Sequence, residues 1–346
     1  MDDRERLLQR LRDEGLEQDA IERASREGRL PTLAVEMALG GRGRHTLTAV
    51  AREADMSPTY LRELLQAIGR PSPARGERAF TDEDIELARI TRRLVDAGLP
   101  RQGIVEAART IGQTTAQIAQ AVRQLVGNAL IQPGDSEQAL GIRYADAVDQ
   151  LAPLVPALLD LNVRAHLREG IRRELITEAE RQEGRLSDTR DVAVAFADLV
   201  GYTGLGSDIA ATELGSIAGR FGELAAGAVR KPVHLVKMIG DAAMFVSDEV
   251  SPMVETLADL RRCVHEAKPE LPEVHIGVAY GPATPRAGDW FGATVNVASR
   301  ITEEAKAGQM LAEEAVCRES NGAWKRRRKR SLKGVDRRLR LYSYES

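Results

Sequence analysis

Cysteine is scarce in this chain of 346 residues, which holds only two. Cys263 and Cys317 stand alone, without the paired spacing of a zinc site or the density of a disulfide-stapled fold. The sequence therefore excludes a small disulfide scaffold. We interpret both residues as buried thiols of a protein that works in a reducing cytoplasm.

Long apolar runs are also lacking. The best candidate for a membrane span, residues 151–163, is shorter than the roughly 18 apolar residues required and carries Asp160 and two prolines. The N-terminus, Met-Asp-Asp-Arg-Glu-Arg, leads into a charged amphipathic helix and holds no apolar segment of a signal peptide. We expect a cytoplasmic protein with no membrane partner.

Neither sign of charge dominates. Lysine and arginine number 49 against 52 aspartates and glutamates, a net charge of -3. This balance argues against a chain whose main role is to coat nucleic acid, and no stable nucleic-acid partner is expected. The content of 43% hydrophobic and 29% charged residues is typical of a globular protein. The length favours two domains.

Residues 1–155 show helical periodicity interrupted by glycine and proline, and no sustained strand alternation. We predict an all-helical N-terminal domain there. Within it, residues 46–110 resemble a helix-turn-helix reader of the MerR type, in which Ser57 would cap a second helix begun by Pro58.

A transcription regulator is therefore one alternative function. The second helix of the helix-turn-helix-like segment, residues 58–68, carries Arg62 as its single basic residue, next to Glu63. That is a poor surface for phosphate-rich DNA, so the alternative is disfavoured.

Residues 156–185 are predicted to form a linker helix. Apolar residues at steps of four, from 159 to 175, keep one stripe on a helix facing a partner. Two interpretations stay open, a signalling linker and an ordinary terminal helix of the first domain. His166 lies on this segment, where its protonation could bias a switch. The other histidines are interpreted as structural or solvated: His45, His234, His265 and His275.

Residues 186–346 change to strands alternating with helices. The fold class we predict is α+β, with a ferredoxin-like β-α-β-β-α-β domain after the helical one. The expected strands are 192–200, two within 234–247, 274–280, 310–316 and 339–344, and the expected helices are 210–229, 253–267 and 294–305.

Two carboxylates in this second half are candidates for binding metal. Asp198, in Phe196-Ala-Asp-Leu-Val-Gly, leaves the end of a buried strand, and Asp241, in Ile239-Gly-Asp, lies in a tight hairpin. If the two strands pair, both carboxylates emerge at one edge of the sheet. Two Mg²⁺ or Mn²⁺ ions held there could activate a ribose hydroxyl and offset charge on a leaving pyrophosphate.

Lys237 and Asp289 suit a purine edge. A lysine ammonium donates to a ring nitrogen, and an aspartate carboxylate accepts from an exocyclic amine, which is the pattern of adenine. Guanine would require the opposite arrangement of donor and acceptor. Taken alone, Lys237 could equally be a solvated strand lysine.

Asn296 and Arg300 are candidates for catalysis. They are four residues apart on a predicted helix, so they share a face and can converge on one ligand. Asparagine can orient the ribose, and the planar guanidinium group of arginine can stabilise negative charge that develops on an α-phosphate.

The three segments that carry these six residues resemble, in wording and spacing, the catalytic domain of the class III nucleotidyl cyclases. The resemblance spans residues 189–346 and implies that ATP is converted to 3′,5′-cyclic AMP and pyrophosphate with two divalent ions per site. It also implies a homodimer, because in this family the metal aspartates and the readers of base, ribose and phosphate come from different subunits. A degenerate, non-catalytic domain is disfavoured because all six roles are filled.

The same resemblance matches Lys333, in Ser331-Leu-Lys-Gly, to a lysine that contacts the terminal phosphates. The basic run 325–330 beside it departs from the family pattern. We leave open whether that run is a solvated surface strand or loop or draws ATP towards the site by its field.

The whole chain resembles actinobacterial adenylate cyclases whose helical N-terminal domain restrains the catalytic dimer. The resemblance implies a sensor in the first domain. Its signal, whether pH or a small apolar ligand, stays open.

Overall fold

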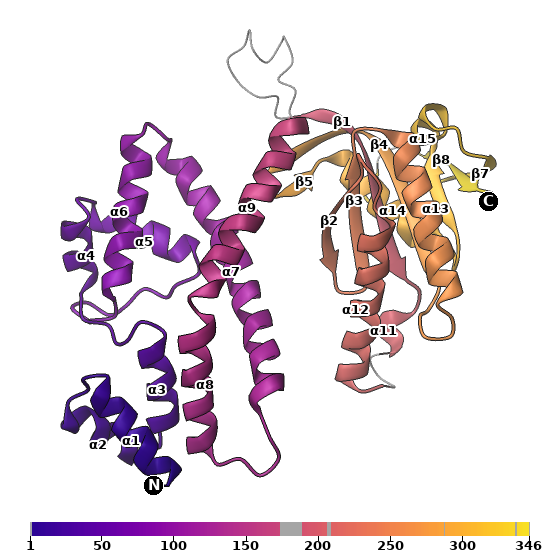
Figure 1. Ribbon diagram of the computed structural model, residues 1–346. Coiled ribbons are helices and arrows are strands. Elements are labelled where there is room, and N and C mark those ends of the chain that lie inside the picture. The colour runs from indigo at the N-terminus through magenta and orange to yellow at the C-terminus, as the bar shows by residue number, and fades with distance from the viewer. Residues whose placement is uncertain (1, 174–188, 206–208, 287, 336–337, 346) are drawn as a thin grey trace. The chain divides into compact units, whose positions relative to one another are not determined.

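The chain forms two compact units, residues 1–175 and 176–346. The structure is a computed structural model, and it describes residues 2–173, 189–205, 209–286, 288–335 and 338–345 (Figure 1). The part of the expected linker helix beyond residue 173 lies outside the described residues.

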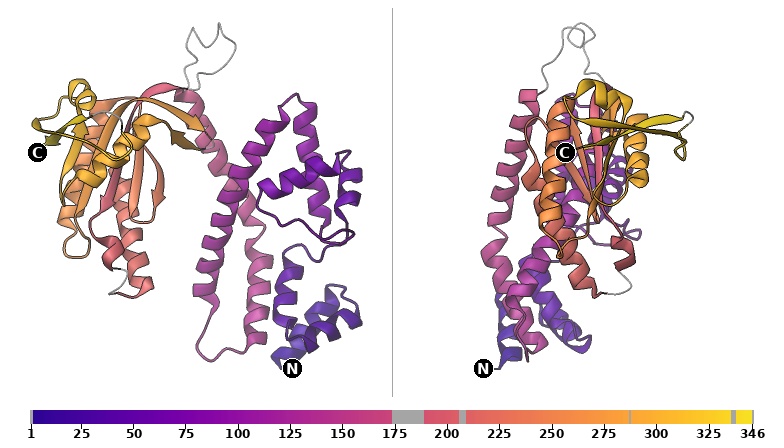
Figure 2. Two further views of the ribbon diagram at one scale, coloured as in Figure 1. Left: turned by 180° about the vertical axis from the view of Figure 1, so that it is seen from behind. Right: turned by 90° about the vertical axis from the view of Figure 1, so that its right-hand side faces the viewer.

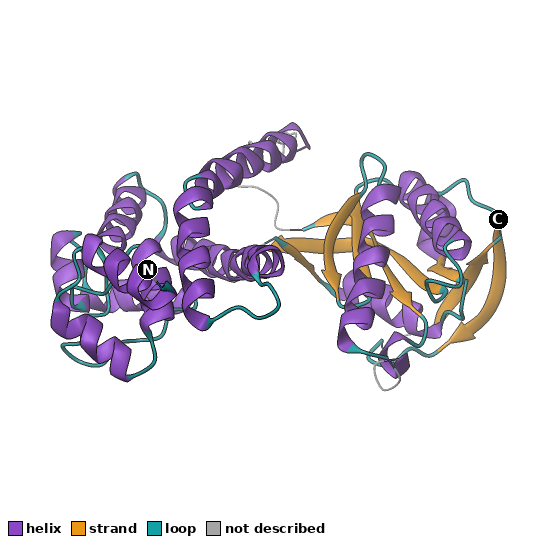
Figure 3. Ribbon diagram, turned by 60° about the horizontal axis from the view of Figure 1, so that its bottom comes forward, coloured by secondary structure: helices purple, strands orange, loops and turns teal. Residues whose placement is uncertain are grey.

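The first unit is helical over its described length, which confirms the all-helical part of the predicted fold (Figure 3). A single isolated bridge, between His45 and Phe80, is the strand pairing found among its described residues. The helices are α1 Asp3–Asp13, α2 Gln18–Arg26, α3 Leu30–Ala38, α4 Leu47–Glu53, α5 Pro58–Ala67, α6 Asp82–Asp96, α7 Arg101–Leu130, α8 Glu137–Leu151 and α9 Leu154–Arg173.

Local sequence signals set several helix starts in this unit. Asp2 accepts a hydrogen bond from the Glu5 amide, and the Glu5 side chain accepts one from the Asp2 amide, which is a capping box. Ser57 accepts from the Tyr60 amide and Pro58 opens α5, as predicted for the helix-turn-helix-like segment.

An apolar cavity of about 460 Å³ lies among α4, α5, α6 and α7. Its walls are almost entirely aliphatic, and Asp84 and Thr91 are the polar residues in the lining. Arg70 pairs with the buried carboxylate of Asp84 and thereby compensates its charge. The cavity is therefore an apolar chamber without an uncompensated charge in its wall.

The second unit is a mixed sheet with helices on both faces, which confirms the predicted ferredoxin-like order. The strands are β1 Arg190–Leu199, β2 His234–Ile239, β3 Ala242–Ser247, β4 Val274–Arg286, β5 Asp289–Phe291, β6 Met310–Glu313, β7 Trp324–Arg330 and β8 Leu339–Tyr344. The helices are α11 Tyr202–Leu205, α12 Ala211–Ala228, α13 Val250–Glu266, α14 Ala293–Glu304 and α15 Glu314–Glu319.

The sheet order is β2-β3-β1-β4-β6-β8-β7, with β5 paired to β4 outside this path. Strands β2, β3, β1 and β4 pair antiparallel in that order, as in a split βαβ arrangement, and β4 pairs parallel with β6. The hairpin of β7 and β8 projects from one edge of the unit, where the ribbon is yellow (Figure 2).

The predicted strand 310–316 is wrong in its second half. Strand β6 ends at Glu313, and α15 begins at Glu314. Val316 is fully buried from the helix, so the apolar residues that suggested a continuing strand fill the core from a helical turn instead. The strand predicted for 274–280 is also too short, since β4 continues to Arg286 and pairs with β5.

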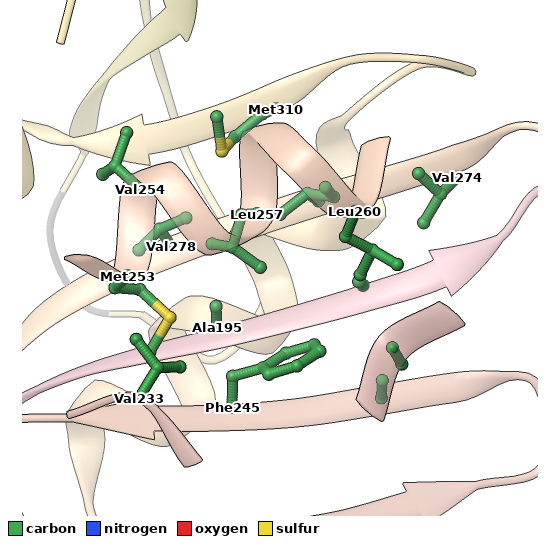
Figure 4. Packing of buried hydrophobic residues seen from close by; sticks show 14 of the residues in the cluster. Ala195, Val233, Phe245, Met253, Val254, Leu257, Leu260, Val274, Val278 and Met310 are labelled. Atoms are coloured by element: carbon green, nitrogen blue, oxygen red, sulfur yellow. The ribbon is translucent and has the colours of Figure 1, made fainter. Parts of the chain in front are cut away.

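Two apolar cores lie on the two faces of the sheet. On one face α12 and α13 cover β1, β3 and β4, and Phe245, Met253, Leu257 and Leu260 are fully buried there (Figure 4). Burial of this kind contributes about 1.5 to 3 kcal/mol per large side chain.

On the opposite face α14 packs against β1 and β4 through Val297, Ala298 and Ile301. Gly277 in β4 allows this close packing, because a Cβ added there would lie 2.2 Å from the Thr302 amide nitrogen. Thr302 also donates its hydroxyl proton to the carbonyl of Ala298 at 3.0 Å. Helix α14 is thus seated tightly on the sheet.

Among the helices that the structure describes, none has both the length and the apolar character needed to cross a membrane.

Candidate active site

The two candidate metal aspartates lie side by side at one end of the central strands. Asp198 is the second-last residue of β1 and pairs in register with Ala242 of β3. Asp241 occupies the turn between β2 and β3, where its carbonyl accepts a hydrogen bond from the Leu199 amide at 3.3 Å. The structure therefore brings these two predicted residues together.

The electrostatics of this pair favour a cation. Burial, followed by the charge of Asp198, raises the pKa of Asp241 to about 6. Two carboxylates that destabilise each other's charge are relieved by a divalent ion between them, and oxygen donors suit Mg²⁺ or Mn²⁺. The described residues hold no cluster of three or more histidine, cysteine, aspartate or glutamate side chains around a metal position. The pair thus supplies carboxylate oxygens of the kind that divalent ions bind.

Lys237 and Asp289 meet on the same sheet. Lys237 extends from β2, Asp289 begins β5, and the ammonium group forms an ion pair with Asp289 Oδ2. The other oxygen, Oδ1, accepts a hydrogen bond from the Trp290 amide at 2.9 Å. Both side chains are about one third exposed, at 38% and 28%. The two predicted base readers are therefore in contact within one chain and remain accessible.

Asn296 and Arg300 lie on the side of α14 that the core leaves open. Val297, Ala298 and Ile301 face the sheet, while Asn296 is exposed and Arg300 pairs with Glu303 on its own helix. Among the described residues, no hydrogen bond or ion pair joins Asn296 or Arg300 to either metal aspartate. Within the described part of one chain, these two predicted groups are therefore not joined by a hydrogen bond or an ion pair.

Lys333 is exposed in the connection between β7 and β8. The basic run beside it is strand β7, whose charged residues are all exposed. Its two ends form ion pairs, Lys325 with Glu345 at 3.2 Å and Arg330 with Glu304 at 3.5 Å. Of the open alternatives for the run, the structure shows a surface strand.

His275 is a neighbour of the site that sequence reasoning assigned to a structural or solvated role. Its Nε2 lies 3.2 Å from Asp198 Oδ2, and its Nδ1 lies 3.0 Å from the Ala305 carbonyl oxygen. The hydrogen bond to Asp198 raises the pKa of His275, while burial acts in the opposite direction. The register of β1 on β4 places the two residues opposite each other, and that pairing is the signal that could have identified the contact.

Two sequence families match the chain in tandem. Residues 1–171 match the adenylate cyclase regulatory domain, and residues 185–344 match the adenylate and guanylate cyclase catalytic domain.

Curated relatives extend over both parts. The chain is 33% identical to a pH-sensitive adenylate cyclase of Mycobacterium tuberculosis, over 98% of this chain and 87% of that protein. It is 31% identical to an adenylate cyclase of Streptomyces coelicolor, over 81% of this chain and 73% of that protein.

Solved structures match the second unit. A guanylate cyclase domain of Catenaria anguillulae in complex with GTP is 20% identical, with a TM-score of 0.42, and covers 46% of this chain and 99% of its own. An adenylyl cyclase of P. aeruginosa is 19% identical, with a TM-score of 0.40, and covers 46% and 97%. The assignment rests on the tandem sequence families and the full-length relatives: the chain belongs to the class III adenylate cyclases, of the actinobacterial type with a helical regulatory domain before the catalytic domain.

Proposed function

We propose that this adenylate cyclase converts ATP to 3′,5′-cyclic AMP and pyrophosphate at sites shared between two copies of the chain, and that the first unit tunes the reaction. One observation carries the proposal. Asp198 and Asp241 converge, whereas Asn296 and Arg300 on α14 form no hydrogen bond or ion pair with them among the described residues. A second copy would supply the missing half.

Asp198 and Asp241 would hold two Mg²⁺ or Mn²⁺ ions through their carboxylates. When bound, such ions lower the pKa of the ribose 3′-hydroxyl and offset charge on the leaving pyrophosphate. The half-buried position of the two aspartates keeps water from screening their charge, which strengthens their hold on a cation.

Lys237 and Asp289 would select adenine. The ammonium group would donate to a ring nitrogen, and the carboxylate would accept from the exocyclic amine. The Trp290 amide orients Asp289 before substrate arrives. Guanine would place an acceptor against the carboxylate and a donor against the ammonium, leaving both groups unpaired.

Asn296 and Arg300 would act on the sugar and the α-phosphate. Asn296 would orient the ribose so that its 3′-oxygen lies in line with the α-phosphorus, and Arg300 would stabilise the charge that develops on the phosphate oxygens. The 3′-oxygen bonds to the α-phosphorus, the bond to the bridging oxygen of pyrophosphate breaks with its electron pair, and the hydroxyl proton passes to solvent. Lys333 would contact the terminal phosphates, and β7 would attract the nucleotide by its field.

Mixing two inactive variants tests the shared site. In a homodimer with two equivalent sites, Asp198→Ala and Asn296→Ala each remove one half of both sites. A mixed dimer contains one intact site, so random exchange should recover about a quarter of the parent activity. The measurement is cyclic AMP formed from ATP with Mg²⁺ or Mn²⁺ after the purified variants are mixed and allowed to exchange.

Asp198→Ala mixed with Asp241→Ala is the matched control, because both changes fall on the same half and no intact site can form. Recovery in that control, or none with the Asn296 variant despite subunit exchange, would contradict the shared site.

The first unit would inhibit catalysis by displacing the catalytic units of the two copies relative to each other. Such a displacement would separate the two halves of each site, since each site would span the interface between the copies. The apolar cavity among α4, α5, α6 and α7 favours a small apolar ligand as its signal. The similarity to a pH-sensitive adenylate cyclase of Mycobacterium tuberculosis supports the other alternative, a response to pH. The free state of Cys263 and Cys317 agrees with action in a reducing cytoplasm.

A further inference from the structure

His275 is held from both sides of its ring. It lies in β4 directly opposite Asp198 of β1, and antiparallel neighbours of this kind have Cβ atoms about 4.5 to 5.5 Å apart. Nε2 lies opposite Asp198 Oδ2 at 3.2 Å, and Nδ1 lies opposite the carbonyl oxygen of Ala305 at 3.0 Å. Both neighbouring atoms are oxygens, so the ring has one orientation in which each of its nitrogens faces a hydrogen-bond acceptor.

The second partner ties His275 to α14. Ala305 is the C-cap of that helix, where carbonyl groups lack partners within the helix. The ring therefore bridges Asp198 to the end of the helix that carries Asn296 and Arg300. The position of the Asp198 carboxylate is thus linked to the seating of α14 on the sheet.

The two side chains of this bridge differ in their exposure to water. The His275 side chain is 18% exposed, whereas that of Asp198 is 37% exposed. Water competes little for the ring, while the carboxylate keeps an open side. The contact with His275 engages Oδ2 of Asp198 and leaves Oδ1 outside this hydrogen bond. An outer hydrogen bond of this kind fixes the rotamer of a ligating carboxylate and commonly changes metal affinity 10- to 100-fold, about the effect expected here.

The geometry points to His275 as the positioning residue of Asp198, which orders that carboxylate for divalent metal and couples it to helix α14. This inference rests on the proposed role of Asp198 as a metal ligand. His275 itself touches neither substrate nor reacting atoms in this arrangement. The competing explanation is a structural cross-strand pair that serves only to stabilise the sheet.

Direct metal binding separates the two explanations. The measurement is titration of the full chain with Mn²⁺, followed by the electron paramagnetic resonance signal of free aqueous Mn²⁺, which is lost on binding. We expect His275→Leu to weaken Mn²⁺ binding about 10- to 100-fold. His275→Gln, whose amide can still donate to Asp198, should lie closer to the parent chain. Saturating Mn²⁺ should restore much of the turnover of the His275 variants.

His265→Leu is the matched control. His265 also lies 2.9 Å from a carboxylate, that of Glu273, but its side chain is 68% exposed, and neither residue forms a side-chain hydrogen bond or ion pair with Asp198. This variant should bind Mn²⁺ like the parent chain. The melting temperature of each variant without metal identifies any loss that comes from unfolding, and His275→Gln decides the matter if His275→Leu does not fold.

The Asp198→Ala variant tests the metal assignment of Asp198 separately from the positioning role of His275. If Asp198→Ala loses Mn²⁺ and the folded His275 variants bind it like the parent, the positioning role is wrong and the metal assignment stands. If Asp198→Ala also binds like the parent, both are wrong. If the His275 variants lost Mn²⁺ affinity only to the extent that His265→Leu does, the loss would reflect a structural role and would overturn the positioning role.

Discussion

At the scale of single residues, the base selectivity that we propose would depend on an ion pair between side chains 52 positions apart. Lys237 and Asp289 are paired with each other in the structure, so an adenine base would have to replace an existing partner of each group. A polar pair of this kind would discriminate between bases, because a wrong base would leave both groups unpaired.

Reversing the charge at position 237 should therefore lower the catalytic efficiency with ATP. We expect Lys237→Glu to lower kcat/KM for ATP by roughly 100-fold or more, because the carboxylate would face a ring nitrogen and repel Asp289. GTP should lose less, so the ATP to GTP ratio of kcat/KM should fall. The check is cyclic nucleotide formation from each triphosphate. Lys325→Glu, which breaks an exposed lysine pair on β7, is the control and should keep the ratio. An unchanged ratio in Lys237→Glu would rule out base reading by this pair.

Sequence reasoning predicted that the two candidate metal residues lie close together, because their places at the ends of two neighbouring strands follow from the spacing of the motifs. Asp198 and Asp241 were expected to meet at a sheet edge, and they do. His275 gave no such signal, because its contact depends on the register of β1 against β4 and on where α14 ends. Neither feature is encoded within a few residues of the histidine.

At the scale of elements, the apolar periodicity predicted the order and type of most helices and strands, but it did not predict their boundaries. Glu313 and Glu314 mark the change from β6 to α15, but a short apolar run does not distinguish a strand from a buried helical turn. The seven-residue strand β7 could not be predicted from apolar alternation either. Its side chains are charged on both faces, and it forms because β8 supplies hydrogen-bonding partners.

The cavity of the first unit gives a prediction at this scale. Ala107 lines it from α7, and Ala107→Trp should place a ring across the chamber and reduce binding of an apolar probe at least about tenfold. The probe is 1-anilinonaphthalene-8-sulfonate, followed by its fluorescence in a titration of the full chain.

Ala116→Trp is the control for the cavity, since Ala116 lies on the exposed surface of the same helix and outside the lining. Equal loss of the probe in both variants, or no saturable binding by the parent chain, would contradict a ligand chamber. Cyclic AMP formation measured with and without the probe would then show whether the chamber communicates with catalysis.

At the scale of the whole molecule, each unit has its own cores and its own family match. A unit with a separate core can fold and act without the other. If the first unit restrains the reaction, residues 186–346 alone should form cyclic AMP several-fold faster than the complete chain at equal concentration of sites.

The comparison should be repeated over a range of protein concentrations, because the isolated unit would lose any help with pairing that the first unit gives. A fragment that is slower even where it is fully dimeric would remove the inhibitory interpretation and favour activation. Equal rates would indicate that the first unit does not set the rate under the conditions used.

Gly277 is a position where the catalytic unit has no space for a side chain. The helix that carries Asn296 and Arg300 rests directly on its backbone, with no space for even one methyl group. An alanine at this position would displace that helix from the sheet, and the disturbance would reach Asn296 and Arg300, which we propose act on the ribose and the phosphate. The geometry of the proposed site therefore depends on the absence of a side chain at a residue to which we assign no role in binding the nucleotide.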